Sequence, residues 1–226
     1  MAVQELIFKG ERLRVERLPY SVFRLVLARP ELRNAFDAVM IGELLQVLSD
    51  LATRPSKELR VLLLVGEGKT FCAGADLDYM RAQALNSAEE NEADARRLGM
   101  VFHRLAAFPA PVLCGIQGAA IGGGFGLAAC ADIVVADPDA VFALSEVRLG
   151  LLPAVISPFV VRKLGLAQAA PLMLSGRRLG APEANVCGLV QALVPAETSL
   201  EVALQAHVLE LLQADDVDAV FLDIRM

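Results

Sequence analysis

The segment Gln117–Leu127 constrains the fold more than any other part of the sequence, because five of its eleven residues are glycine. Glycine loses much conformational entropy on folding, so three in a row at Gly122–Gly124 need a structural reason. We infer a tight turn that begins a helix near Gly124. The N-terminus of a helix has unpaired backbone N–H groups and a partial positive charge, which suit it to bind a phosphate or a transient oxyanion.

Three interpretations of this glycine segment compete. The simplest is a close crossing of two helices, which requires small residues. The second is a dinucleotide-binding loop, since Gly124-x-Gly126-x-x-Ala129 fits the pattern G-x-G-x-x-G/A. That loop follows directly on a strand, however, whereas the strand-like Val112–Cys114 ends well before it. The third is an oxyanion hole, which needs a second N–H donor and an acid or base from elsewhere in the chain.

The bulk properties indicate one domain with a large apolar core. The chain has 226 residues, of which 55% are hydrophobic, and its formal net charge is −6. The acidic balance argues against nucleic acid as a partner. No apolar run is long and uncharged enough to span a bilayer, and the first residues lack the pattern of a signal peptide. We therefore expect a cytoplasmic protein without a membrane partner.

The cysteines and histidines give no sign of a metal site. The four cysteines, at positions 72, 114, 130 and 187, form no C-x-x-C pair and have apolar neighbours, which favours reduced, buried thiols. His103 and His207 lie far apart on helix-like segments, so we expect no zinc site. A Ser-His-Asp hydrolase is also disfavoured, because the sequence has no G-x-S-x-G motif.

Hydrophobic periodicity predicts strands that alternate with helices. Apolar residues at helical spacing from Ile41 to Leu48 predict one helix, Ser87–Glu90 is a capping box for another, and Ser157 with Pro158 is typical of a helix start. The expected strands are 21–27, 60–65, 111–116, 133–136, 140–144 and 189–194, and the expected helices are 41–54, 87–108, 124–131, 157–164, 182–187 and 200–212. This alternation is typical of an α/β fold with a mainly parallel sheet.

Five short motifs follow one another along the chain. They are Arg29-Pro30-x-x-Arg33-Asn34-Ala35, Phe71-Cys72-Ala73-Gly74-Ala75-Asp76-Leu77, Gln117-Gly118-x-x-Ile121-Gly122-Gly123-Gly124, Ala131-Asp132-Ile133 and Phe142-x-x-Ser145-Glu146-x-x-Leu149-Gly150-Leu151-Leu152-Pro153. In this order they resemble the crotonase (enoyl-CoA hydratase/isomerase) superfamily over about residues 20–195. Each motif alone is modest, but five in the right order are a strong signal.

This resemblance implies a crotonase-like spiral of ββα units, assembled as a homotrimer or hexamer. Residues 1–165 would form the spiral core, and residues 166–226 a shortened helical segment that contributes to trimer contacts. The ligand would be an acyl-CoA thioester that is itself the substrate, so no separate cofactor is expected. The backbone N–H groups of Ala75 and Gly123 would form the oxyanion hole that stabilises the thioester enolate, in agreement with the third interpretation of the glycine segment.

The resemblance also assigns CoA contacts to residues that act largely through main-chain atoms. These are Arg33, Ala35, Ala73, Asp76 and Leu77. Lys69 and Arg33 carry charges that suit the CoA phosphates. For each of these two side chains the alternative is a solvated surface position.

Glu146 is the candidate acid/base. The best-known hydratases use two glutamates, and in this sequence Gly126 stands at the first position whereas Glu146 matches the second. Because Glu146 lies among apolar residues, we expect desolvation to raise the pKa of its carboxyl. A glutamate introduced at position 126 is expected to rebuild the two-carboxylate arrangement. The alternatives are a structural ion pair for Glu146 and a catalytic role for Asp76.

Within the superfamily, the segments Asp76–Arg81 and Ser145–Pro158 resemble single-glutamate hydratases of the methylglutaconyl-CoA and isohexenylglutaconyl-CoA type. This branch implies a branched, carboxylated enoyl-CoA, whose carboxylate could pair with Arg148. The segment Val217–Arg225 does not resemble the final helices of the family. A more open acyl pocket is one expected consequence.

The leading functional hypothesis is a lyase that adds water across the 2,3 double bond of an enoyl-CoA, with Glu146 as the acid/base. The second hypothesis is a double-bond isomerase, in which Glu146 moves a proton between C2 and C4. A dehydratase that acts on a carrier-protein thioester and a non-catalytic acyl-CoA-binding protein are the remaining alternatives.

Overall fold

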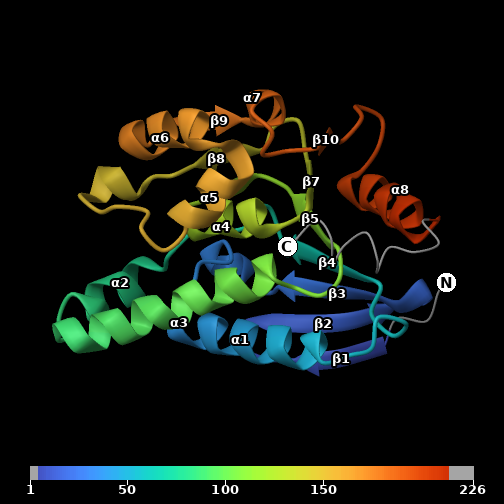
Figure 1. Ribbon diagram of the computed structural model, residues 1–226, viewed down its shortest axis with the longest axis horizontal. Helices are drawn as coiled ribbons and strands as arrows, with labels where there is room; N and C mark the ends of the chain where they lie inside the picture. Colours follow the sequence, from blue (N-terminus) through green and yellow to red (C-terminus); the bar gives the residue numbers. More distant parts are fainter. Residues whose placement is uncertain (1–4, 214–226) are drawn as a thin grey trace.

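The computed structural model describes residues 5–213, which form two β-sheets and the helices around them (Figure 1). Within this range the main sheet has the strand order β1-β2-β3-β4-β5-β7-β10, and a smaller sheet has the order β6-β8-β9. The main strands are β1 (Glu5–Lys9), β2 (Leu13–Leu18), β3 (Val22–Leu27), β4 (Val61–Gly66), β5 (Val112–Ile116), β7 (Ile133–Ala136) and β10 (Ala192–Leu193). The smaller sheet contains β6 (Ala119–Ile121), β8 (Val141–Ala143) and β9 (Arg178–Gly180).

The helices follow the strands in the alternation that the sequence predicts. They are α1 (Ala38–Ala52), α2 (Leu77–Gln83), α3 (Ala88–Ala106), α4 (Gly123–Cys130), α5 (Ser157–Leu164), α6 (Leu166–Ser175), α7 (Ala181–Val186) and α8 (Leu200–Gln213). The strands from β3 to β10 in the main sheet pair in parallel, whereas β1 and β2 add an antiparallel edge. The predicted α/β class with a mainly parallel sheet is confirmed.

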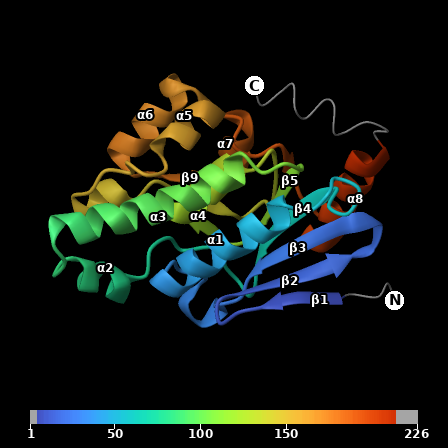
Figure 2. The same cartoon turned by 60° about the horizontal axis from the view of Figure 1, so that its bottom comes forward.

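Both faces of the main sheet are covered, which explains the continuous apolar run of β4. Leu62 and Leu64 lie in the core on the side of α1 and α3, while Leu63 lies in the smaller cluster on the side of α8. Figures 1 and 2 show α1 and α3 side by side across one face and α8 apart from them. A strand buried on both faces needs apolar residues at successive positions rather than in alternation.

The glycine segment differs from the single turn that the sequence predicts. Gly118 and Gly122 both have a positive φ, of 64° and 50°, and between them lies the short strand β6. The helix α4 begins at Gly123, with Gly122 as its N-cap. A strand thus directly precedes this helix, and the expectation that the nearest strand ends well before it was wrong. The position of the strand therefore does not exclude a dinucleotide-binding loop.

Several other expectations need correction. The last predicted strand, 189–194, is reduced to the two residues of β10. The N-cap of α5 is Ile156 rather than Ser157, whose hydroxyl donates to the Ala154 carbonyl instead. The sequence analysis missed β1, β2, β6, β9, α2 and α6. The capping box of α3 is confirmed, with Ser87 and Glu90 each bonded to the other's backbone N–H.

Three further expectations concern cysteines, metals and membranes. All four cysteines are free thiols, and three are buried, while Cys187 is partly exposed. Within residues 5–213 no cluster of side chains could hold a metal ion, and no helix has the length and apolar character needed to cross a membrane.

The domain boundary expected near residue 166 stays a prediction. The strands β9 and β10, which follow this position, pair with β8 and β7, which precede it. The segment Val217–Arg225 lies outside the described residues.

Asn34 ties two loops together beneath the carboxyl ends of β3 and β4. Its side chain is fully buried, and its backbone has a φ of 55°. The amide oxygen accepts from the Arg29 N–H at 2.8 Å. The amide nitrogen lies within 3.0 Å of the carbonyl oxygens of Glu67, Thr70 and Phe71. One side chain thus satisfies the polar backbone of the loop that follows β4.

Asn34→Ala is expected to lower the free energy of unfolding by about 3 kcal/mol or more, because it leaves several buried backbone groups without partners. Urea denaturation followed by circular dichroism measures the loss. Asn185→Ala is the control, since that exposed side chain makes a single hydrogen bond with the Val190 carbonyl at 2.9 Å. Equal losses in the two variants would contradict a central role for Asn34.

Candidate active site

One cavity of about 300 Å³ lies where three parts of the chain meet. The first part is the turn Ala73–Ala75 with α2, the second is the segment Ile121–Gly123, and the third runs from Ser145 to Ile156. Ala75, Gly123 and Glu146, the three residues predicted to be catalytic, all line this cavity. The structure therefore brings together residues that are far apart in the sequence.

The backbone N–H of Ala75 is left unpaired by the way its turn is held. Phe36 donates its N–H to the Gly74 carbonyl and accepts from the Asp76 N–H, both at 2.8 Å. The Gly74 carbonyl and the Asp76 N–H therefore point toward Phe36. The Ala75 N–H lies trans to the Gly74 carbonyl in the same peptide group, so it points away from Phe36. This N–H has no hydrogen-bond acceptor within residues 5–213.

Gly123 supplies a second unpaired N–H as the first residue of α4. The first N–H groups of a helix have no acceptor within the helix, and the structure gives this one none elsewhere in the described range. The two turns touch, because a Cβ added to Gly122 would lie only 3.9 Å from the Cα of Gly74. The residues that follow these two glycines, Ala75 and Gly123, therefore present their N–H groups at neighbouring points of one cavity.

This close approach explains why glycine is needed at several positions. A Cβ on Gly74, whose φ is 93°, would lie 2.9 Å from the Ile121 carbonyl oxygen. A Cβ on Gly123 would lie 2.8 Å from the buried ring of Phe36. A side chain at position 74 would therefore force the two turns apart, and one at position 123 would displace the Phe36 ring.

Glu146 lies beside these donors without a partner for its charge. It begins a short 3₁₀ helix, Glu146–Leu149, and its Oε1 would be 3.1 Å from a Cβ on Gly122. Its Oε2 is buried and has no hydrogen-bond partner, and no cation pairs with the carboxyl in the described part of the chain. Burial raises the pKa of this carboxyl above the ordinary value for glutamate, as expected. The alternative of a structural ion pair has no support.

Position 126 faces the core rather than open space. A Cβ on Gly126 would lie 2.5 Å from Ile156 Cγ2 and 2.9 Å from Phe102 Cε1. The expectation that a glutamate placed there rebuilds a second acid/base is therefore wrong for a single substitution, since the side chain has no room. Ile156 itself lines the cavity, so an apolar wall stands beside position 126.

Asp76 is not a rival acid/base, because it faces away from the cavity lining. Its carboxylate accepts from the N–H groups of Asp78 and Tyr79 and pairs with Arg29 at 2.8 Å. Burial alone would raise the pKa of this carboxyl, but those hydrogen bonds and the Arg29 cation outweigh burial and leave the pKa below its ordinary value. A carboxylate held in this way is a structural group.

The residues predicted to contact CoA divide into two groups. Ala73 and Leu77 line the cavity, with Leu77 exposed at its edge. Arg33, Ala35, Lys69 and Asp76 do not line it. Arg33 and Lys69 are exposed, as both the CoA-phosphate prediction and its alternative require. These CoA assignments stay predictions.

The helix α2 forms a cavity wall that the sequence analysis did not identify. Leu77, Met80 and Gln83 line the cavity from this helix. The hydroxyl of Tyr79 donates to Asp94 of α3 at 2.5 Å, and the Gln83 amide donates to the same carboxylate. The spacing of Leu77 and Met80 was the one available signal in the sequence. The helix is short and buries none of its residues, so its sequence carries no clear apolar stripe.

Arg148 does not line the cavity and is exposed. Its side chain lies instead near Gly176, where an added Cβ would be 3.4 Å from Arg148 Cγ. The structure therefore gives no support to a pairing of Arg148 with a substrate carboxylate.

The fold and the residues that meet at this cavity agree with the crotonase superfamily that the sequence motifs resemble. Residues 17–221 match the family model described as enoyl-CoA hydratase/isomerase. The chain belongs to this family. The match also decides against the dinucleotide-binding interpretation of the glycine segment.

Similar proteins include hydratases and an isomerase. A protein called putative enoyl-CoA hydratase from Thermus thermophilus is 39% identical over 174 residues, which cover 77% of this chain and 68% of that protein. The 1,2-epoxyphenylacetyl-CoA isomerase of Escherichia coli is 34% identical over 187 residues, or 82% of this chain and 71% of that one. The crystal structure of an enoyl-CoA hydratase from Shewanella pealeana has a TM-score of 0.83 and 38% identity, and the match covers 96% of this chain and 76% of that chain. The chain spans about two thirds of the length of the curated relatives it matches.

Glu146→Gln is expected to stabilise the protein at neutral pH. The raised pKa means that folding favours the protonated carboxyl, so the ionised form destabilises the fold as the pH rises through the raised value. Below the pKa of the unfolded chain the penalty is absent. The melting temperature of the variant should exceed that of the wild type by about 2 °C or more at neutral pH, with a much smaller difference near pH 4.

The control is Glu197→Gln, which alters an exposed glutamate outside the cavity and should leave the melting temperature close to that of the wild type. A lower melting temperature of Glu146→Gln at every pH would mean that the carboxylate stabilises the fold.

Proposed function

We propose that this protein is an enoyl-CoA hydratase, with a double-bond isomerase as the second candidate. The observation that carries the proposal is the meeting of two unpaired backbone N–H groups with one unpartnered, half-buried carboxylate at the same cavity. Membership of the hydratase/isomerase family supports it. The reaction needs no cofactor beyond the CoA thioester of the substrate.

The proposed chemistry begins at the thioester carbonyl. Its oxygen accepts hydrogen bonds from the N–H groups of Ala75 and Gly123, which polarise the conjugated double bond. As water attacks C3, the Glu146 carboxylate takes one of its protons, and the π electrons move to the thioester oxygen. Protonated Glu146 then gives a proton to C2 as the enolate collapses, which regenerates the carboxylate. One carboxylate thus completes the addition of water.

The donors stabilise the enolate more than the ground state, because negative charge develops on the thioester oxygen only during the reaction. Loss of one such donor typically lowers kcat by about 10²–10³-fold. Both donors are backbone groups held by tight turns, so they need no reorganisation when the charge appears. The N-terminus of α4 adds a favourable dipole at Gly123.

The raised pKa of Glu146 suits the first half of this cycle, in which the carboxylate acts as the base. A carboxyl with an ordinary pKa is a weak base and gives up its proton too readily near neutral pH, whereas a higher value improves proton transfer in the first step. The carboxylate is the form that starts the reaction, so kcat/KM should fall as the pH drops below the raised pKa.

The isomerase candidate has one observation in its favour, which is the single carboxylate. Moving a proton between C4 and C2 needs one base and an oxyanion hole, and position 126 offers no room for a second carboxylate. In that reaction no water takes part. A dehydratase for carrier-protein thioesters would use the same groups, and a non-catalytic binder would use the N–H groups alone.

The acyl chain that fits this cavity is uncharged. The described lining residues include no lysine, arginine or histidine, and most of the walls are apolar, including Met80, Leu98 and Val155. A carboxylate buried there would lose hydration without gaining a cation. We therefore expect uncharged acyl groups to be better substrates than the carboxylated ones that the single-glutamate branch implies.

Assembly as a homotrimer or hexamer also stays a prediction.

Hydration of crotonyl-CoA removes the ultraviolet absorbance of the conjugated thioester, and isomerisation of a 3-enoyl-CoA creates it. Wild-type protein should hydrate crotonyl-CoA, and more slowly a homologue with a terminal carboxylate. Glu146→Gln should lower kcat by about 10⁴-fold with little change in affinity, since acid–base catalysis contributes up to about that factor. Glu197→Gln is the control and should match the wild type.

Absorbance gained only from a 3-enoyl-CoA would favour the isomerase. If Glu146→Gln keeps more than about a tenth of the wild-type rate, the carboxylate is not the acid/base. If the wild-type protein binds acyl-CoA but turns over neither substrate, the non-catalytic acyl-CoA-binding protein would be the remaining alternative.

A further inference from the structure

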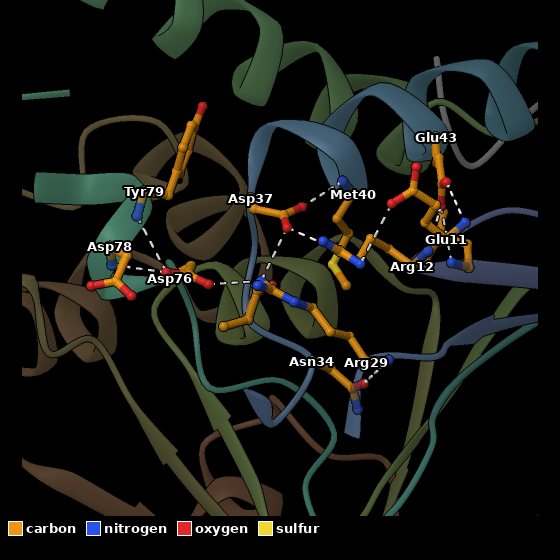
Figure 3. Close-up of polar contacts among 12 residues, drawn as sticks. Glu11, Arg12, Arg29, Asn34, Asp37, Met40, Glu43, Asp76, Asp78 and Tyr79 are labelled. Carbon is orange, nitrogen blue, oxygen red and sulfur yellow. Dashed lines mark hydrogen bonds and ion pairs between the residues drawn. The ribbon is translucent and has the colours of Figure 1, made fainter. Parts of the chain in front are cut away.

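Arg29 lies between the N-termini of two helices and is only 8% exposed (Figure 3). Its Nη1 is 2.8 Å from Asp76 Oδ2 and 3.2 Å from Asp37 Oδ2. The same nitrogen donates to the Ala35 carbonyl at 3.1 Å. One guanidinium thus holds two carboxylates that would otherwise repel each other.

Each of these carboxylates also caps a helix. Asp37 accepts from the Met40 N–H at 2.8 Å and begins α1, while Asp76 accepts from the Asp78 N–H at 2.8 Å and begins α2. Figure 3 shows the carboxylates of both caps directed toward the guanidinium of Arg29. The cation therefore joins the start of a core helix to the start of the helix that walls the cavity.

Asp76 directly follows Ala75, whose N–H is one of the two proposed oxyanion donors. The peptide group between Ala75 and Asp76 is fixed by the hydrogen bond from the Asp76 N–H to the Phe36 carbonyl. The Asp76 side chain is fixed by Arg29 and by α2. The Ala75 turn is thus held at Gly74 by Phe36 and at Asp76 by Phe36 and Arg29, so a shift of Asp76 would alter the direction of the Ala75 N–H.

We propose that Arg29 is a positioning residue for catalysis, which orients the Ala75 N–H by holding Asp76. The inference rests on the proposed function, because it assigns Arg29 a role in that oxyanion hole. Arg29 does not line the cavity, so its effect reaches the reaction through the groups it holds, which are chiefly Asp76 and also the Ala35 carbonyl next to Phe36. Removal of the cation should leave Asp76 buried without its charge partner and free the turn to shift.

Arg12 provides a matched control within the same network. Its Nε donates to Asp37 Oδ2 at 2.9 Å, so Asp37 is paired with both arginines, whereas Asp76 pairs with Arg29 alone in the described range. Arg12→Gln removes a cation from the α1 cap and leaves the pair of Arg29 with Asp76 intact. Arg29→Gln removes the cation from Asp76 while Arg12 still pairs with Asp37.

The test compares Arg29→Gln with Arg12→Gln in kcat, KM, melting temperature and amide hydrogen exchange. Arg29→Gln should lower kcat by about 10–100-fold with KM changed less than about threefold, since a misplacement of about 1 Å can cost 10²-fold. Peptides that contain residues 75–83 should exchange faster in this variant only. Arg12→Gln should keep kcat within about threefold of the wild type, because the oxyanion donor is undisturbed.

Equal losses of kcat in both variants, or an unchanged kcat in Arg29→Gln, would overturn the inference. If Arg29→Gln does not fold, Asp76→Asn replaces it, since the asparagine still caps α2 but lacks the charge that Arg29 pairs with. It should show the same loss of kcat with an intact fold, and a wild-type kcat in Asp76→Asn would overturn the inference. Absence of turnover by the wild-type protein would refute the proposed function. The amide hydrogen exchange of residues 75–83 in Arg29→Gln would still show whether Arg29 holds this turn.

Discussion

The contact between the turn at Gly74 and the turn at Gly122 is the constraint on which the rest of the site depends. The Gly74 turn is bridged to Phe36, and the Gly122 turn lies between β6 and α4. Neither turn would tolerate a larger side chain at the contact, because added Cβ atoms would meet backbone or Glu146. This close packing leaves two backbone N–H groups without acceptors beside one cavity. Ala75 is exposed and Gly123 is half-buried, so both N–H groups are accessible to a ligand that enters the cavity.

The charges around the cavity are arranged in two layers. Next to the cavity is a single carboxylate, Glu146, which is partly buried and has no partner in the described residues. Behind the Ala75 turn is a layer of paired charges, in which Arg29 joins Asp37 and Asp76 (Figure 3). The inner carboxylate destabilises the fold but is available for proton transfer. The outer layer stabilises the turns and does not enter the chemistry. Such a division between a strained site and a well-paired support is common in enzymes.

The sequence allowed most of the sheet to be predicted, and the three residues predicted to be catalytic do meet at one cavity, but the residues that support them were not foreseen. The strands β4 and β7 and the helix α3 have long apolar runs or a capping box, and these local signals sufficed. The strand β6 has only three residues between two glycines, and α6 contains Pro171, so local signals there pointed away from regular structure. Ala75 and Gly123 were identified through resemblance to the family, since their side chains carry no chemistry. The obstruction of position 126 by Ile156 and the pairing of Arg29 with Asp76 depend on contacts between distant segments, which no local pattern encodes.

A crystal structure of the protein with a bound, unreactive acyl-CoA thioester would test the central claim most directly. The thioester oxygen should lie about 2.7–3.1 Å from the backbone nitrogens of both Ala75 and Gly123, with the Glu146 carboxyl beside C2 and C3 of the acyl group. A thioester that binds with its carbonyl oxygen turned away from either nitrogen, or outside the cavity, would contradict the assignment of the oxyanion hole.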